Sequence, residues 1–105
     1  MDDSDFVPCI EEGKIREGEM KNVHVGGKAV LLVKKQGKIF CLLNKCPHQG
    51  CSFEKGILNE NTVICPCHGW RFDIRNGKCL GGREITLPTY QCRIENYEVY
   101  IKLQK

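Results

Sequence analysis

The chain of 105 residues is long enough for one small domain, and 41% of its residues are hydrophobic. Its formal net charge of +3 is small and spread along the chain, which argues against a nucleic-acid partner. No apolar run is long enough to cross a bilayer, and the acidic residues 1–5 precede no signal-peptide core. We therefore expect a single cytoplasmic domain over residues 1–105, with no membrane contact.

Short strand-like runs separated by tight turns dominate the chain. In chain order the predicted strands cover residues 6–10, 19–25, 28–35, 38–43, 71–74, 78–80, 89–94 and 97–103. Turn pairs that favour hairpins follow several of them: Gly26-Gly27, Gln36-Gly37 and Asn76-Gly77. Glycines interrupt residues 10–20, where we expect one helical turn or a loop. The pattern predicts an all-β fold of antiparallel strands, closed or stacked to protect its edges.

The closing hairpin is predicted to turn at Glu95-Asn96. In its last strand Tyr97, Val99, Ile101 and Leu103 alternate with polar or half-polar residues, as in a half-buried strand. By contrast, the segment of about residues 44–82 is rich in turns. We expect it to form a small subdomain inserted between strands of the scaffold.

This insertion carries two cysteine–histidine segments, Cys46-Pro47-His48 and Cys65-Pro66-Cys67-His68, with sixteen residues between His48 and Cys65. Each segment offers one thiolate and one imidazole in the same order. That set suits a [2Fe–2S] cluster with cysteines on one iron and histidines on the other. A structural zinc site is the alternative, although zinc usually takes C-x₂₋₄-C and H-x₃₋₅-H pairs.

Charge explains what the two histidines would do to such a cluster. Two ferric ions, two sulfides and two thiolates sum to zero, whereas four thiolates would leave a charge of minus two. A neutral oxidised centre accepts an electron more readily, so histidine ligation raises the reduction potential.

Eight cysteines are many for an intracellular chain, but their spacing does not resemble a disulfide framework. Four of them stand in apolar surroundings, and we expect small buried hydrophobes there: Cys9, Cys41, Cys79 and Cys92. His24 stands alone between valines and is expected to be a surface or packing residue.

Residues 44–50 and 65–73 resemble the two cluster loops of Rieske proteins, specifically the small soluble Rieske-type ferredoxins of archaea and of oxygenase systems. Residues 76–77, 80–82 and 87–90 match the stretch that follows in that family. The resemblance implies stacked antiparallel sheets, with the cluster subdomain at one tip of the molecule.

The resemblance also implies the site and the function. Cys46, His48, Cys65 and His68 would hold the cluster, with both histidines exposed at the tip. The protein would be a monomeric electron carrier and not itself an enzyme. Its partners would be a ferredoxin reductase and a terminal oxygenase or another redox enzyme. The alternative is an electron-transfer or regulatory subunit of a larger oxidoreductase.

Cys51 and Cys67 depart from the oxygenase-type ferredoxins and match cysteines that form a disulfide in respiratory Rieske subunits. We hypothesise a disulfide that clamps the two loops; two reduced cysteines, or a redox-switching pair, are the alternatives. The hydroxyl residues that raise the potential in the respiratory class are replaced here by Trp70 and Phe72. We therefore expect a potential near the low end of the Rieske range.

Overall fold

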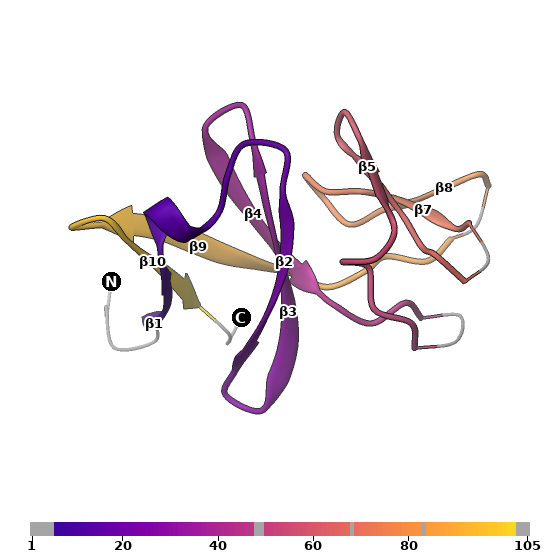
Figure 1. The fold of residues 1–105 in the computed structure, drawn as a ribbon. Coiled ribbons are helices and arrows are strands. Elements are labelled where there is room, and N and C mark those ends of the chain that lie inside the picture. The colour runs from indigo at the N-terminus through magenta and orange to yellow at the C-terminus, as the bar shows by residue number, and fades with distance from the viewer. Residues whose placement is uncertain (1–5, 48–49, 68, 83, 103–105) are drawn as a thin grey trace.

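The computed structural model of the chain describes residues 6–47, 50–67, 69–82 and 84–102. Its elements, in chain order, are β1 (Phe6–Glu11), the 3-10 turn η2 (Glu12–Lys14), β2 (Met20–Val25), β3 (Lys28–Lys35), β4 (Lys38–Leu43), β5 (Ile57–Asn59), β6 (Thr62–Ile64), β7 (Arg71–Asp73), β8 (Cys79–Leu80), β9 (Thr89–Glu95) and β10 (Glu98–Lys102). The molecule is elongated, 38 × 26 × 20 Å, with a larger and a smaller sheet at its two ends (Figure 1). In the part of the chain so described, no helix has the length and apolarity to span a membrane.

The larger sheet has the strand order β1-β10-β9-β4-β3-β2. It consists of two three-stranded halves, which join where β4 pairs with β9 through Cys41 opposite Tyr90 and Leu42 opposite Thr89. Every strand pairing is antiparallel, which confirms the predicted fold class.

Strand β3 is the centre of the molecule because it is buried on both faces. Val30 and Leu32 point into the core of the larger sheet, whereas Leu31 and Val33 belong to a second core shared with the smaller sheet. All four side chains are fully buried. This double burial explains why the apolar run in β3 is uninterrupted instead of alternating with polar residues.

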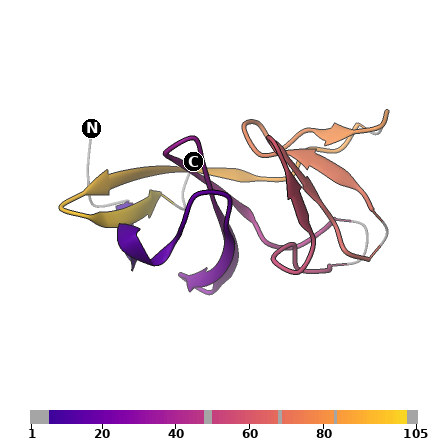
Figure 2. The ribbon, with the colours of Figure 1, turned by 45° about the horizontal axis from the view of Figure 1, so that its top comes forward.

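The smaller sheet, with the order β5-β6-β7-β8, lies within the segment predicted to form the insertion. The chain enters it after β4 and returns through the start of β9, and both connections are visible in Figure 2. The hairpin of β5 and β6 was absent from the sequence prediction. Each strand has only three residues, and the turn between them uses Glu60 with a positive φ of 56° instead of a glycine.

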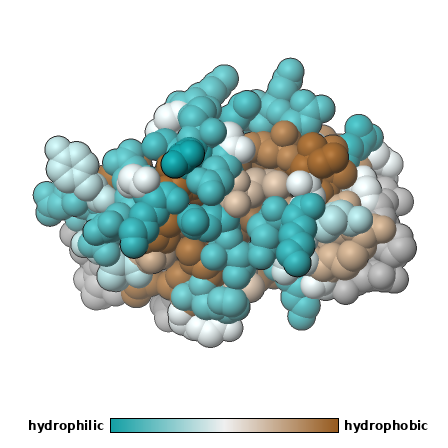
Figure 3. All heavy atoms as spheres, in the orientation of Figure 1, coloured by the Kyte–Doolittle hydropathy of each residue, from teal (hydrophilic) through white to brown (hydrophobic). Residues whose placement is uncertain are grey.

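One cross-strand row of the smaller sheet faces outward and borders the second cysteine segment. It aligns Ile57 with Ile64, Ile64 with Arg71, and Arg71 with Leu80. Ile57 is 59% exposed and Leu80 is 37% exposed. Hydrophobic atoms gather over this part of the molecule, near β5, while hydrophilic atoms cover much of the rest of this view (Figure 3).

The closing hairpin corrects one prediction. Val99 and Ile101 are buried as expected, but Tyr97 is 83% exposed because it belongs to the turn. Asn96 and Tyr97 have φ values of 52° and 65°, the positive pair that a type I′ turn requires, and Glu95 pairs with Glu98. The turn is therefore one residue later than predicted. Leu103 lies outside the described residues.

Three smaller predictions concern residues 10–20, His24 and the four cysteines in apolar surroundings. The expected helical turn is present as η2, and His24 is exposed on β2. Cys41 and Cys79 are buried as expected. The description of Cys9 and Cys92 as buried is wrong, because both are only half-buried.

Candidate metal centre

The two predicted cysteine ligands lie at the junction of the sheets. Cys46 follows β4, and Cys65 lies directly between β6 and the loop that leads into β7. Their side chains are 2% and 3% exposed, and both belong to the core shared by the two sheets. His48 and His68 lie outside the described residues, so their part of the predicted ligand set stays a prediction.

The first loop is closed by two backbone hydrogen bonds. The Cys46 N–H donates to the Cys51 carbonyl at 2.8 Å, and the Gly50 N–H donates to the Cys46 carbonyl at 2.6 Å. Gly50 has a φ of 75°, a conformation that side chains with a Cβ rarely adopt. The two hydrogen bonds thus bring Gly50 and Cys51 back to the backbone of Cys46.

The second loop repeats this geometry. The Cys65 N–H donates to the Trp70 carbonyl at 2.8 Å, and the Gly69 N–H donates to the Cys65 carbonyl at 3.0 Å. Gly69 has the same φ of 75°. Two segments that are distant in sequence thus present their first cysteine on equivalent backbone turns.

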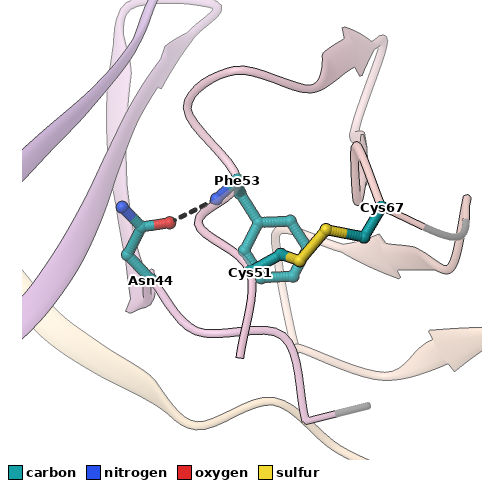
Figure 4. The surroundings of a disulfide bond; sticks show 4 residues. All are labelled: Asn44, Cys51, Phe53 and Cys67. Carbon is teal, nitrogen blue, oxygen red and sulfur yellow. Dashed lines mark hydrogen bonds between the residues drawn. A yellow bond between two sulfur atoms is a disulfide. The ribbon is translucent and has the colours of Figure 1, made fainter. Parts of the chain in front are cut away.

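A disulfide between Cys51 and Cys67 joins the two loops (Figure 4). The Cα atoms of the two cysteines are 6.5 Å apart, within the usual range for a disulfide, and their sequence separation is 16. The sulfur of Cys65 lies within 4.8 Å of both disulfide sulfurs. Since Cys51 and Cys67 are bonded to each other, they offer no thiolate to a metal, and the cysteines of these loops that lie outside the disulfide are Cys46 and Cys65.

The floor of the site is apolar and tightly packed. Phe53 and Phe72, both fully buried, meet edge to face with their ring centroids 5.6 Å apart. They pack in the same core cluster as Cys46 and Cys65. An apolar shell of this kind excludes water from the sulfur side of a cluster and influences its potential.

Asn44 supports the first loop, a role that was not predicted from the sequence. Its side chain is 2% exposed, and its Oδ1 accepts the Phe53 N–H at 2.6 Å (Figure 4). Its Nδ2 donates to Asn22 Oδ1 at 2.7 Å and to Glu54 Oε1 at 2.6 Å. Asn44 thus ties β2 of the larger sheet to the segment after the first loop. The sequence feature that indicates this role is a polar residue directly after the apolar run of β4.

The turn between β7 and β8 is held by an ion pair. The Asp73 carboxylate accepts the Arg75 backbone N–H at 2.8 Å and binds the Arg75 guanidinium at 3.0 and 2.8 Å. The hydrogen bonds from the Arg75 side chain, followed by that from its backbone, hold the pKa of Asp73 below its ordinary value.

Gly77, at the end of the same turn, contacts the strand-like segment before β9. The Leu87 N–H donates to the Gly77 carbonyl at 2.7 Å. A Cβ on Gly77 would collide with the Leu87 carbonyl oxygen, and the φ of 78° is itself unfavourable for other residues. Only glycine allows this close approach.

The described donors fit the thiolate half of a [2Fe–2S] cluster. Two buried thiols come from two loops of equivalent backbone geometry, and each loop carries one predicted histidine. The loops are fixed to each other by a disulfide and to the scaffold by a buried hydrogen-bond network. A centre that exchanges electrons benefits from such rigidity, because its geometry then changes little between oxidation states.

Comparison with known proteins agrees with this geometry. A model of the Rieske [2Fe-2S] domain matches residues 5–91. The ferredoxin component of the alkene monooxygenase system of Xanthobacter autotrophicus is 33% identical over 101 residues, covering 95% of this chain and 83% of that protein. The Sphingomonas yanoikuyae B1 ferredoxin structure has a TM-score of 0.86 at 25% identity, covering 94% of this chain and 99% of that one.

The chain belongs to the Rieske [2Fe-2S] domain family, and its cofactor is accordingly a [2Fe–2S] cluster. Relatives that it matches over most of their length are ferredoxin components, which carry electrons and do not transform a substrate. Human apoptosis-inducing factor 3 is also 38% identical over 103 residues, covering 92% of this chain. This chain spans only 17% of that relative.

Proposed function

We propose that the protein is a Rieske-type ferredoxin that carries single electrons from a reductase to an acceptor enzyme such as an oxygenase. The observation that carries the proposal is the pair of equivalent loops, each with a buried cysteine at the same position. The similarity to ferredoxin components of oxygenase systems supports it.

In this proposal Cys46 and Cys65 ligate one iron, and His48 and His68 ligate the other. The bound cluster supplies one-electron exchange at a potential above that of all-cysteine clusters. The protein's own contribution is to hold the two thiolates in a dry apolar pocket and to keep the loops in register.

The Cys51–Cys67 disulfide serves in this proposal as a clamp between the loops. Phe53 and Phe72 exclude water beneath the cluster, and neither they nor Trp70 offers a hydroxyl to the cluster sulfurs. The potential is therefore proposed to lie near the low end of the Rieske range.

The partners dock beside the second loop. The outward row of Ile57, Ile64 and Leu80, with Arg71 in its middle, offers a small apolar surface next to Cys65. A surface of this size suits the weak, short-lived contacts of redox proteins. We propose a cytoplasmic monomer that meets a ferredoxin reductase and a terminal oxygenase in turn.

Stopped-flow reduction by a ferredoxin reductase, followed by reoxidation with an oxygenase, tests this function. We expect one electron per chain to pass, with a second-order rate. Ile57→Glu should lower that rate at least several-fold, while Tyr97→Glu, a change to another exposed hydrophobic residue, in the closing hairpin, should leave it unchanged. A protein that accepts and passes on no electron would refute the proposed carrier. Equal effects of both variants would refute the proposed docking surface.

A second candidate is an electron-transfer or regulatory subunit of a larger oxidoreductase, with Cys51 and Cys67 as its redox switch. The match to a small part of human apoptosis-inducing factor 3 favours it, because domains of this family also occur within longer proteins. Size-exclusion chromatography of the chain alone separates the two: a stable monomer supports the carrier, and self-association or aggregation supports the subunit.

A further inference from the structure

Two cysteines of the larger sheet stand side by side, away from the cluster loops. Cys41 lies on β4 opposite Tyr90 of β9, and Cys92 lies two residues further along β9 on the same face. The Cys92 Sγ is 2.9 Å from the Ile39 carbonyl oxygen, to which it donates when protonated. Cys92 also packs against the core cluster that contains Cys41.

A cavity of about 330 Å³ gives access to this pair. Its lining includes both cysteines and Tyr90 from the larger sheet, and Ile74 and Arg75 from the turn of the smaller sheet. Cys41 is 2% exposed, whereas Cys92 is half-buried. Cys92 is therefore the more accessible of the two cysteines.

The pKa values of the two thiols shift in opposite directions. The hydrogen bond from Cys41 lowers the pKa of Cys92, which favours its thiolate. The same hydrogen bond, followed by burial, raises the pKa of Cys41 and keeps it a thiol. Cys92 is also the more exposed of the two, so it is the thiol that an oxidant reaches first, and Cys41 is in the position of a resolving thiol.

We propose that Cys92 and Cys41 form a second redox site, which hydrogen peroxide oxidises to a disulfide independently of the cluster. The Cys92 thiolate attacks one peroxide oxygen, the O–O bond breaks, and the departing hydroxide takes up a proton to become water. The resulting Cys92 sulfenic acid is attacked by the Cys41 sulfur, the S–O bond breaks, and a second water leaves. In sum, two thiols and hydrogen peroxide give one disulfide and two waters.

Oxidation of this site would link the two strands that connect the larger sheet to the smaller one. The chain leaves β4 for the smaller sheet at Asn44 and returns to β9 after Pro88. Oxidation would place a covalent bond between these strands beside that junction, and reduction by a thiol would remove it.

Cys9 provides a matched control. It is half-buried in the same core, and its Sγ donates to the Val99 carbonyl at 3.2 Å. Burial raises the pKa of Cys9 to about 11, so this thiol stays protonated and unreactive. A general sensitivity of the cysteines to peroxide would affect Cys9 as well, whereas the proposed site would not.

The experiment treats the cluster-loaded protein with a few equivalents of hydrogen peroxide, blocks remaining thiols with an alkylating reagent and maps tryptic peptides by mass. Trypsin gives peptides 39–45 and 84–93, whose single cysteines are Cys41 and Cys92. We expect these peptides to be cross-linked by a bond that a thiol reductant cleaves, while the visible spectrum reports the cluster separately.

Single serine substitutions distinguish the thiol that peroxide attacks, the resolving thiol and the control thiol. Cys92→Ser should abolish the cross-link and leave Cys41 alkylatable, and Cys41→Ser should leave Cys92 as a sulfenic acid that dimedone traps. Cys9→Ser should behave like the unmodified chain. The proposal is overturned if both peptides of the unmodified chain stay alkylatable after peroxide, if the cross-link joins Cys9, or if oxidation proceeds equally without Cys92. The unmodified chain alone decides the first two points, whether or not a variant folds.

Discussion

Removal of the Cys51–Cys67 disulfide is the perturbation whose magnitude follows most directly from the structure. The bridge closes a loop with a sequence separation of 16. In the chain-entropy account, such a crosslink stabilises a fold by about 3 kcal/mol through the unfolded state. For a domain of this size, each 1 kcal/mol corresponds to roughly 4–8 °C, so Cys51→Ala should lower the unfolding temperature by about 12–24 °C.

Thermal unfolding at a fixed scan rate, with the cluster bound, measures this loss. Because either cysteine suffices to abolish the bond, Cys51→Ala, Cys67→Ala and the double variant should lose the same amount. A thiol reductant should lower the unfolding temperature of the unmodified chain and leave that of the variants unchanged. Additive losses in the double variant, or losses below about 1 kcal/mol, would refute the clamp.

Three further predictions concern the site and its support. Phe72→Tyr should raise the midpoint potential by about 40 mV, because its hydroxyl can donate a hydrogen bond to cluster sulfur. Such a bond contributes about 1 kcal/mol, and the potential of a one-electron couple shifts by about 59 mV for each tenfold change in the equilibrium constant. An unchanged midpoint in a redox titration of the folded variant would count against this account. Gly77→Ala should lower the free energy of unfolding, measured by thermal unfolding, by about 2–4 kcal/mol. Gly13→Ala, at a position with open space around it, should change that free energy by less than about 0.5 kcal/mol. Equal effects of the two substitutions would contradict the role of the close approach between Gly77 and Leu87. Asp73→Asn should lower the free energy of unfolding by about 1 kcal/mol at neutral pH. The lowered pKa of Asp73 contributes stability that is present above about pH 4 and is lost as the pH falls through the folded-state pKa. A difference in stability from the unmodified chain that persists at pH 2 would argue against an ionic contribution.

Most of the larger sheet was predictable because its strands carry clear local signals. The runs in β3 and β4 are long and apolar, and their turns contain Gly-Gly or Gln-Gly. The hairpin of β5 and β6 carried no such signal: three residues cannot establish a period, and Glu60 adopts a positive φ without being glycine. The late turn at Tyr97 likewise depends on two successive residues with positive φ, one of them an aromatic that does not favour that conformation.

The cysteine segments were recognisable because their pattern is local and specific. Their support was not, because Asn44 acts through partners 22 and 10 residues away in sequence. Cys41 and Cys92 likewise come together in one core cluster from two strands distant in the chain, and local composition describes both only as small hydrophobes. Local spacing thus predicts ligands, while tertiary contacts determine which polar and thiol groups meet.

Iron and acid-labile sulfide analysis of the purified protein, combined with pulsed EPR of its dithionite-reduced form, tests the central claim most directly. Two irons and two sulfides per chain, with hyperfine couplings to two nitrogen nuclei, would establish a cluster held by two thiolates and two imidazoles. Zinc in place of iron, no labile sulfide, or a reduced cluster without nitrogen coupling would contradict it.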